Sequence, residues 1–278
     1  MALLDLIPPR LAHHFKDGLA SDGSLPKTRP PTLALVGSRA ATLEAARLTR
    51  HLAALAVQRG MVIVSGGARG IDTAAHEGAM EAGGITWLVS PGPLGEAFPR
   101  ENRDLFARVV RGGGAIVTRQ LGAASPSTRL FFKRNALLVA LSDAVVVIQA
   151  GFPSGTLNAA KHARDFAVPL WACAAPPGLT AFAGTNSLLE KGLAKAVWRP
   201  ELLFSSLGLP DTPPHTPCVQ ISLEATPLLN AMSEKAMHLD DIIDVCSMAG
   251  HEVAVHLLTL AGLGVVREGP PGWFRRLR

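Results

Sequence analysis

The sequence has no tyrosine, few other aromatic residues and only three cysteines. Phenylalanine and tryptophan alone supply the aromatic fraction of 5%, which excludes any mechanism built on a tyrosine acid, nucleophile or stacking surface. Cys173, Cys218 and Cys246 lie far apart and form no C-x-x-C pair. This pattern argues against a disulfide framework or a zinc site and favours buried thiols in a reducing compartment.

Long apolar runs and targeting signals are missing as well. Stretches such as residues 144–148 are far shorter than the roughly 20 residues that a membrane helix needs. The first nine residues carry an acidic side chain and two prolines, whereas a signal peptide has a basic and then an apolar region. We therefore expect a cytoplasmic protein with no membrane segment.

The composition is that of a folded protein with an uneven positive charge. The 278 residues are 48% hydrophobic and 18% charged, which predicts one or two globular domains with a substantial core. The net charge is +5, and the stretch from Arg29 to Asn135 holds fourteen basic but only seven acidic residues. Most of the basic residues are arginines, the side chain suited to bidentate phosphate contacts. An anionic partner is therefore expected to meet the first half of the chain.

Short apolar segments alternate with amphipathic ones along most of the chain. Strands are predicted at 32–36, 61–65, 85–90, 115–118, 144–149 and 169–173, and helices at 42–59, 71–82, 101–111, 130–141 and 156–166. Continuous apolar strands separated by helices indicate a mostly parallel sheet that is covered on both faces. We predict an α/β fold with an extended Rossmann-like, doubly wound sheet. Ligands of such sheets bind beyond the carboxyl ends of the strands.

Composition also divides the chain into segments. We predict a short N-terminal extension at 1–31, the Rossmann-like domain at 32–206, a proline-rich linker at 207–232 and a winged-helix-like domain at 233–278. A winged helix reads duplex DNA through its second helix, but the corresponding helix at 252–261 has no Arg or Lys. The preceding helix carries Asp240, Asp241 and Asp244. These charges favour a protein-docking or self-associating module, or a plain cap, over an independent duplex reader.

Four strand-to-helix turns are predicted to meet at the carboxyl edge of the sheet. Their candidate nucleic-acid-binding residues are Gly37, Ser38 and Arg39; Ser65, Gly66, Gly67, Arg69 and Gly70; Phe132, Lys133, Arg134 and Asn135; and Ser154, Gly155 and Thr156. Glycines allow close backbone approach, and helix N-termini hold phosphate through free N–H groups. Because cations at a helix N-terminus oppose the macrodipole, the basic cluster indicates an anionic partner. The turns together predict one basic groove in which Phe132 stacks a base.

Candidate catalytic groups are scarce. The sequence has no G-x-G-x-x-G or P-loop motif and no Ser-His-Asp order, so we predict no cofactor, no metal and no catalytic residue. Asp72 and His76 lie four residues apart on one helix face, where they could pair. Packing and capping roles explain both residues at least as well.

The order of several short motifs resembles that of the DNA-processing protein A (DprA, or Smf) family. The motifs are Val36-Gly-Ser-Arg39, Val64-Ser-Gly-Gly-Ala-Arg-Gly-Ile-Asp72-Thr-Ala-Ala-His76, Pro99-x-x-Asn102-x-x-Leu105, Phe131-x-x-Arg134-Asn135 with Leu141-Ser142, Ser154-Gly-Thr-Leu157 and Gly184-x-Asn186-x-Leu188. The resemblance runs from about Leu33 to Gly192. It implies an extended Rossmann domain that binds single-stranded DNA, forms a homodimer and helps to load the RecA recombinase in transformation and recombination, with no known catalysis.

This chain departs from the pattern of that family at several positions. Arg119, Ala136 and Gln149 stand where the family usually has glutamate, arginine and glutamate. A related superfamily, the lysine-decarboxylase-like phosphoribohydrolases, shares the sheet but uses P-G-G-x-G-T-x-x-E, and residues 151–158 lack both its paired glycines and its glutamate. A nucleotide-binding sensor or nucleotide-processing enzyme on this sheet remains the alternative interpretation.

Overall fold

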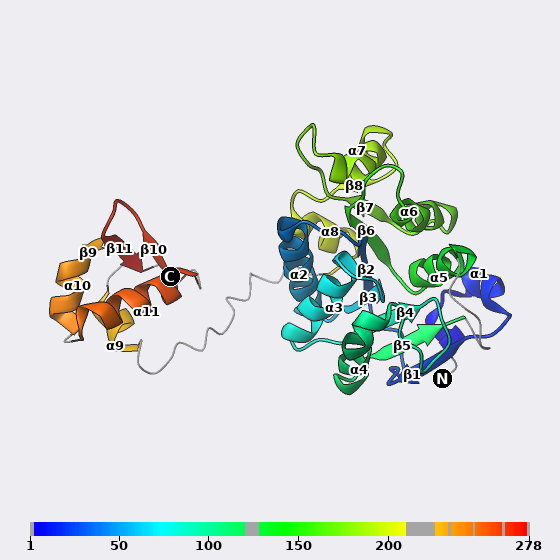
Figure 1. Ribbon diagram of the computed structural model, residues 1–278, viewed down its shortest axis with the longest axis horizontal. Coiled ribbons are helices and arrows are strands. Elements are labelled where there is room, and N and C mark those ends of the chain that lie inside the picture. Colours follow the sequence, from blue (N-terminus) through cyan, green and yellow to red (C-terminus); the bar gives the residue numbers. More distant parts are fainter. Residues whose placement is uncertain are drawn as a thin grey trace. The chain divides into compact units, whose positions relative to one another are not determined.

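An eight-stranded sheet organises the larger of two units, Met1–Pro213, in the computed structural model (Figure 1). The structure describes residues 3–119, 128–209, 226–232, 235–246, 248–262 and 265–276. The strands are β1 (Ala20–Gly23), β2 (Thr32–Gly37), β3 (Val62–Gly66), β4 (Thr86–Ser90), β5 (Ala115–Thr118), β6 (Ala144–Gln149), β7 (Leu170–Ala172) and β8 (Lys195–Ala196), in the spatial order β1-β5-β4-β3-β2-β6-β7-β8. All pairs are parallel except β1 with β5, so the predicted fold class is confirmed.

Helices cover both faces of this sheet (Figure 1). On one face lie α2 (Leu43–Val57), α3 (Ile71–Glu81), α4 (Arg103–Arg111) and α8 (Pro200–Ser206). On the other lie η1 (Leu3–Leu6), α1 (Pro9–Ala12), η2 (His13–Phe15), α5 (Thr128–Ala140), α6 (Thr156–Asp165) and α7 (Ala183–Glu190). A hydrophobic core lies on each face of the sheet, and alternate residues of one strand belong to different cores. In β2, Ala34 and Val36 pack on one face, and Leu33 and Leu35 pack on the other. The strands therefore read as continuous apolar runs.

The N-terminal part of the larger unit holds a strand that was not expected from the sequence. β1, within the predicted N-terminal extension, pairs antiparallel with β5 through residues such as Asp22 and Gly23, which have low strand propensity. The apolar residues before it, including Leu6 and Phe15, are buried in the main core. The extension is thus part of the fold of the larger unit.

The order in which the chain adds strands to the sheet reverses at β2, which pairs with β3 on one side and with β6 on the other. The chain runs outward from β2 through β3, β4 and β5, and then returns to β6. The loops after β2 and β6 consequently leave the sheet side by side and lead into helices on opposite faces. This is the topological switch point, where open α/β sheets hold their ligands.

The smaller unit, Pro214–Arg278, contains helices and a three-stranded antiparallel sheet in the order β10-β11-β9. Its elements are α9 (Thr226–Ala231), β9 (Met237–His238), α10 (Leu239–Cys246), α11 (Gly250–Gly262), β10 (Val266–Glu268) and β11 (Trp273–Arg276). Leu228, Leu229 and Met232 are buried with Ile242 in its core. The predicted linker at 207–232 includes these three residues. A helix as short as α9 has too few apolar positions to show the helical period in its sequence.

Within the described parts of both units, no helix is long and apolar enough to cross a membrane.

Candidate functional site

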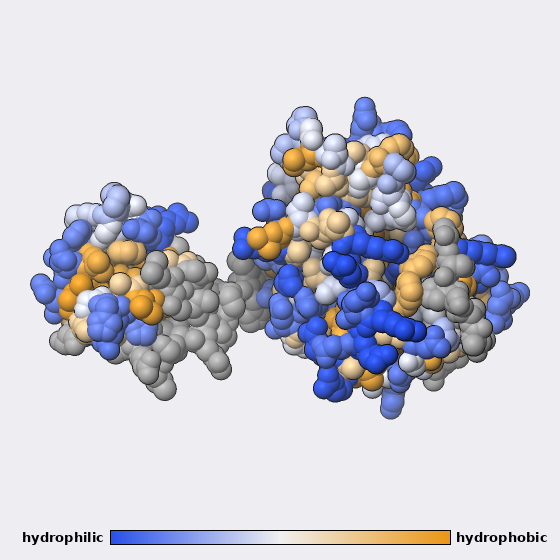
Figure 2. Space-filling model, viewed as in Figure 1, coloured by the Kyte–Doolittle hydropathy of each residue, from blue (hydrophilic) through white to orange (hydrophobic). Residues whose placement is uncertain are grey.

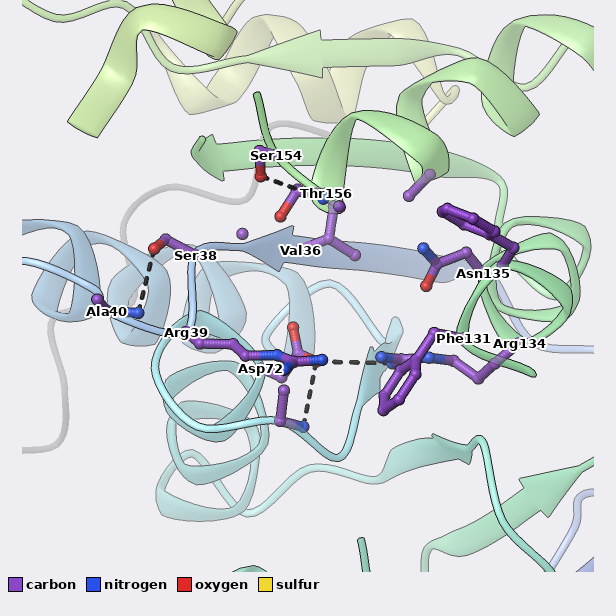
Figure 3. Close-up of a pocket in the computed structure, with 15 residues that line it drawn as sticks. Val36, Ser38, Arg39, Ala40, Asp72, Phe131, Arg134, Asn135, Ser154 and Thr156 are labelled. Atoms are coloured by element: carbon purple, nitrogen blue, oxygen red, sulfur yellow. Dashed lines mark hydrogen bonds and ion pairs between the residues drawn. The ribbon is translucent and has the colours of Figure 1, made fainter. Parts of the chain in front are cut away.

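A cavity of about 690 Å³ opens at the switch point, between the carboxyl ends of β2 and β6 and the start of α5 (Figure 3). It brings together nine of the residues predicted from the sequence: Gly37, Ser38, Arg39, Phe132, Arg134, Asn135, Ser154, Gly155 and Thr156. The same cavity is lined by Ala68 and Asp72 from the neighbouring turn and by Phe131.

Two further cavities continue along the carboxyl edge of the sheet. One of about 380 Å³ is lined by Arg69, and one of about 60 Å³ is lined by Lys133 and Arg119. Arg134 lines all three. We call the three together the sheet-edge groove, which extends from the end of β6 past β2, β3 and β4 to the end of β5. In Figure 2, strongly hydrophilic side chains lie among apolar ones across the middle of the larger unit.

Two residues fix the loop that carries Arg39. A Cβ on Gly37 would lie 2.5 Å from the Ile71 side chain, so only glycine lets β2 approach α3 this closely. Gln149, buried at the end of β6, accepts a hydrogen bond from the Thr42 N–H (2.9 Å) and donates one to the Ala40 carbonyl (3.2 Å). A carboxylate cannot donate the second bond, so the departure at position 149 gives this chain a loop tied at two points.

The glycine turn after β3 has a different role from the one predicted. Ser65 is fully buried and donates to the Leu35 carbonyl (2.6 Å). A Cβ on Gly66 would overlap the guanidinium of Arg134, and a Cβ on Gly67 would lie 2.6 Å from the Phe106 ring. None of these three residues lines the groove. The glycines therefore make room for protein side chains, and the turn supports the groove from beneath.

Arg134 is buried, although the sequence suggested a cluster of exposed cations. Its Nη1 lies 3.6 Å from Oδ2 of Asp72, and both side chains are 8% exposed (Figure 3). Burial raises the pKa of Asp72, and the positive charge of Arg134 opposes that rise. Among the described residues, Nε of Arg134 has no hydrogen-bond partner. The guanidinium lines all three cavities, and exposed Arg39 contributes a second positive charge beside it.

Phe131 is the central aromatic residue of the groove; in the sequence it belongs to a family motif but was not among the predicted binding residues. Its ring centroid lies 5.0 Å from the Arg39 guanidinium carbon and 5.9 Å from that of Arg134. Phe132 also lines the first cavity and is 44% exposed. The sequence could have indicated this role for Phe131, because Phe131 and Arg134 are three residues apart and therefore share a helix face.

Asp72 and His76 do not form the pair that the sequence left open. His76 Nε2 lies 2.9 Å from the Gly66 carbonyl, and Nδ1 lies 2.7 Å from the Thr86 hydroxyl. A carbonyl only accepts, so Nε2 carries the proton. Burial lowers the pKa of His76 to about 4, which keeps the ring neutral. Its contacts are those of a structural residue. In the described ranges, no three His, Cys, Asp or Glu side chains are grouped to hold a metal.

The other two departures have structural explanations. Ala136 is buried on the inner side of α5, so it faces the core and not the groove. Arg119 donates to the His14 carbonyl (3.0 Å), lies 3.8 Å from Asp17 and covers the Phe15 ring. This arginine links the end of β5 to the N-terminal segment while it lines the third cavity.

The sequence was compared with known families and proteins. The family model described as DNA recombination-mediator protein A matches residues 10–208. Protein Smf of Escherichia coli K12 is 30% identical over 285 residues, which cover 99% of this chain and 76% of that protein. The putative DNA processing protein DprA of Mycobacterium tuberculosis is 35% identical over 184 residues, which cover 66% of this chain and 47% of that protein. The chain thus spans about three quarters of one relative and about half of the other.

Solved structures agree with the sequence comparison. DNA processing protein A from Streptococcus pneumoniae matches with a TM-score of 0.65 and 27% identity, covering 74% of this chain and 72% of that chain. The protein of the same name from Helicobacter pylori, described with a single-stranded DNA binding mode, matches with a TM-score of 0.59 and 29% identity, covering 70% of this chain and 96% of that chain. Since the family model spans nearly all of the larger unit and the E. coli relative aligns with almost the whole sequence, the chain belongs to the DNA recombination-mediator protein A family, the DprA or Smf family.

Proposed function

We propose that this chain binds single-stranded DNA in the sheet-edge groove. The observation that carries the proposal is the row of three cavities lined by cationic side chains, the first two of which are also lined by at least partly exposed aromatic rings. A groove with this combination holds the phosphates electrostatically while bases stack on the rings, with little dependence on sequence. Support also comes from the family and from the H. pylori relative, whose described property is single-stranded DNA binding.

Each part of the groove has a distinct role in this proposal. Arg39, Lys133 and Arg134 contact phosphates, and the N–H groups of Gly37 and of Gly155 at the start of α6 add hydrogen bonds. Phe131 and Phe132 offer ring faces to the bases. Arg134 needs no rearrangement to act, because Asp72 and the glycine turn already hold its guanidinium in place.

The wider role is proposed on family grounds. We propose that the chain acts in the cytoplasm as a homodimer, protects single-stranded DNA and helps to load the RecA recombinase onto it. It would act by binding alone, without a chemical step. His76 is fully buried, and the Asp72 carboxylate at the first cavity is occupied by Arg134 and the Ala68 N–H, so neither is placed as a general acid or base.

A comparison of DNA substrates tests the proposal. Fluorescence anisotropy should show tighter binding of the full chain to a single-stranded oligodeoxynucleotide than to the matching duplex. If Arg39, Lys133 and Arg134 each neutralise one phosphate, affinity should fall about 20-fold between 50 and 200 mM salt, from a slope of about −0.7 per contact. A mononucleotide sensor, which a cavity at the switch point would also suit, would bind a nucleoside monophosphate as tightly as the oligomer and lose far less affinity with salt. That result would contradict single-stranded DNA binding and favour a mononucleotide sensor.

Single substitutions in the groove provide the second prediction. Arg39→Ala and Lys133→Ala should each weaken single-stranded DNA binding and reduce the salt slope by about 0.7, because each removes one phosphate contact. Both side chains are exposed, so the thermal unfolding midpoint should not change. Arg111→Ala is the matched control: this arginine is 71% exposed and lies outside the groove. Parental affinity and salt slope in both groove variants would contradict the proposed path of the strand.

A further inference from the structure

The third cavity of the sheet-edge groove is much smaller than the other two. It is lined by Ser90 at the end of β4, Arg119 just after β5, Asp17 from the N-terminal segment, and Lys133 and Arg134 from α5. Its volume of about 60 Å³ lies far below the roughly 300–1,000 Å³ of sites for drug-sized ligands. A compact group such as a phosphate therefore suits this cavity better than a nucleobase does.

The described lining of this cavity carries an excess of positive charge. Arg119, Lys133 and Arg134 line it together with one carboxylate, that of Asp17. Because Asp72 lies 3.6 Å from Arg134 and offsets its charge, two cations face one anion. A glutamate at position 119, where the family usually has one, would make the excess charge negative. The cavity of this chain thus favours an anion.

The N-terminal segment holds Arg119 at the cavity. Nη2 of Arg119 donates to the His14 carbonyl (3.0 Å), and its guanidinium carbon lies 4.8 Å from the centroid of the buried Phe15 ring. The Arg119 side chain is only 18% exposed. A guanidinium has five N–H donors, so one that is bound to a single carbonyl can also bind a phosphate. A side chain fixed in this way loses little conformational freedom when a ligand binds.

The other polar groups of the cavity are compatible with a phosphate. The Asp17 carboxylate lies 3.8 Å from Nη2 of Arg119, on an 86%-exposed side chain. A surface ion pair of this kind contributes little, so a phosphate can replace the carboxylate beside Arg119. The buried Ser90 hydroxyl accepts from the Gly92 N–H (3.1 Å), and a hydroxyl that accepts one hydrogen bond can still donate its own proton.

We propose that the third cavity is a subsite for one phosphate of the bound single strand, and that Arg119 is a ligand of this phosphate together with Lys133. This inference rests on the proposed single-stranded DNA binding. It adds Arg119, and the N-terminal segment that holds it, to the binding site. It also extends the path of the strand to the end of β5.

Arg119→Gln tests the subsite, because glutamine keeps an N–H donor for the His14 carbonyl but removes the charge. In fluorescence anisotropy with an oligodeoxythymidine, the full-length variant should bind about 2- to 12-fold more weakly than the parent, the range for one lost hydrogen bond. The excess positive charge of the cavity is then lost, so the salt slope should fall by about 0.7.

Asp17→Asn makes the opposite change. It removes the carboxylate that competes with the phosphate, so the variant should bind the oligomer about 2- to 5-fold more tightly than the parent. Because Asp17 is exposed, this variant tests the subsite even if Arg119→Gln fails to fold. Asp104→Asn is the matched control: it changes the net charge equally at a 72%-exposed side chain outside the groove and should bind as the parent does.

Three results would overturn the inference. Weaker binding by Arg119→Gln with an unchanged salt slope would mean that Arg119 only holds the N-terminal segment in place. Parental affinity in Arg119→Gln, or equal affinity in the two aspartate variants, would mean that the strand does not enter the third cavity. If Arg39→Ala still weakens binding in those cases, the proposed function stands without this subsite. A parent that binds no oligomer would instead overturn the proposed function.

Discussion

Replacing Arg134 by methionine should lower the free energy of unfolding of the larger unit by about 3–5 kcal/mol at pH 7. The substitution provides an apolar side chain of similar length but leaves the buried Asp72 carboxylate without its ion-pair partner. Urea unfolding followed by tryptophan fluorescence measures the loss, since Trp87 and Trp171 are buried in this unit. The double variant Asp72→Asn/Arg134→Met removes both charges and should recover much of the loss.

The deficit of Arg134→Met should also depend on pH. Without Arg134, the pKa of Asp72 rises further above its usual range, because the strongest of the effects that oppose desolvation is lost. The folded variant keeps a proton that the unfolded chain, with a pKa of about 3.9, has released. Its stability therefore falls as pH rises from about 4 toward the raised pKa, and the deficit should be smaller at pH 5 than at pH 7. A deficit below about 1 kcal/mol, or one independent of pH, would show that the pair contributes little.

The central strands of the sheet were predictable because burial on both faces requires a continuous run of apolar residues in the sequence. Residues 144–149 are apolar up to the final glutamine, and the observed strand has these bounds. Strand β1 has no such apolar run, since an edge strand with one partner can be built from polar residues such as Asp22. Its presence depends on pairing with β5, which lies about 100 residues later and is not a local property.

The position of the site was predictable for the same reason, but the direction of its side chains was not. Gly37–Arg39 and Ser154–Thr156 follow parallel strands, so topology alone brings them together. Which side chains of α5 face the first cavity depends on the rotation of the helix: Phe131 and Arg134 point inward, and Lys133 reaches the third cavity.

The burial of Arg134 could not be predicted either. It requires the space left by Gly66 on one side and the carboxylate of Asp72 on the other. These partners come from a turn more than sixty residues earlier in the chain. In sequence, a basic cluster at a helix start has the same appearance whether its members are exposed or buried.

Gly70, which precedes α3, affects both the stability of the larger unit and the position of the loop that carries Arg39. Gly70 has φ 77° and ψ −123°, a conformation that residues with a Cβ rarely adopt. A Cβ there would lie 2.3 Å from the Ser38 carbonyl oxygen and 2.7 Å from that of Arg39. These are backbone atoms of the loop that carries Arg39, and the Ile71 N–H donates to the same Ser38 carbonyl (3.1 Å). A side chain at position 70 would therefore displace the loop.

Gly70→Ala should destabilise the larger unit by at least about 2 kcal/mol and weaken single-stranded DNA binding even where the variant remains folded. Gly83→Ala is the matched control, because Gly83 has φ 73° just after α3 but, among the described residues, no atom within 4 Å of its would-be Cβ. That control carries only the backbone penalty of about 1 kcal/mol and should bind DNA as the parent does. Urea unfolding and anisotropy on the same samples give both quantities. Equal stability and equal binding in the two variants would show that the Ser38–Arg39 loop yields to an added methyl group, and that the groove does not depend on the contact between this loop and α3.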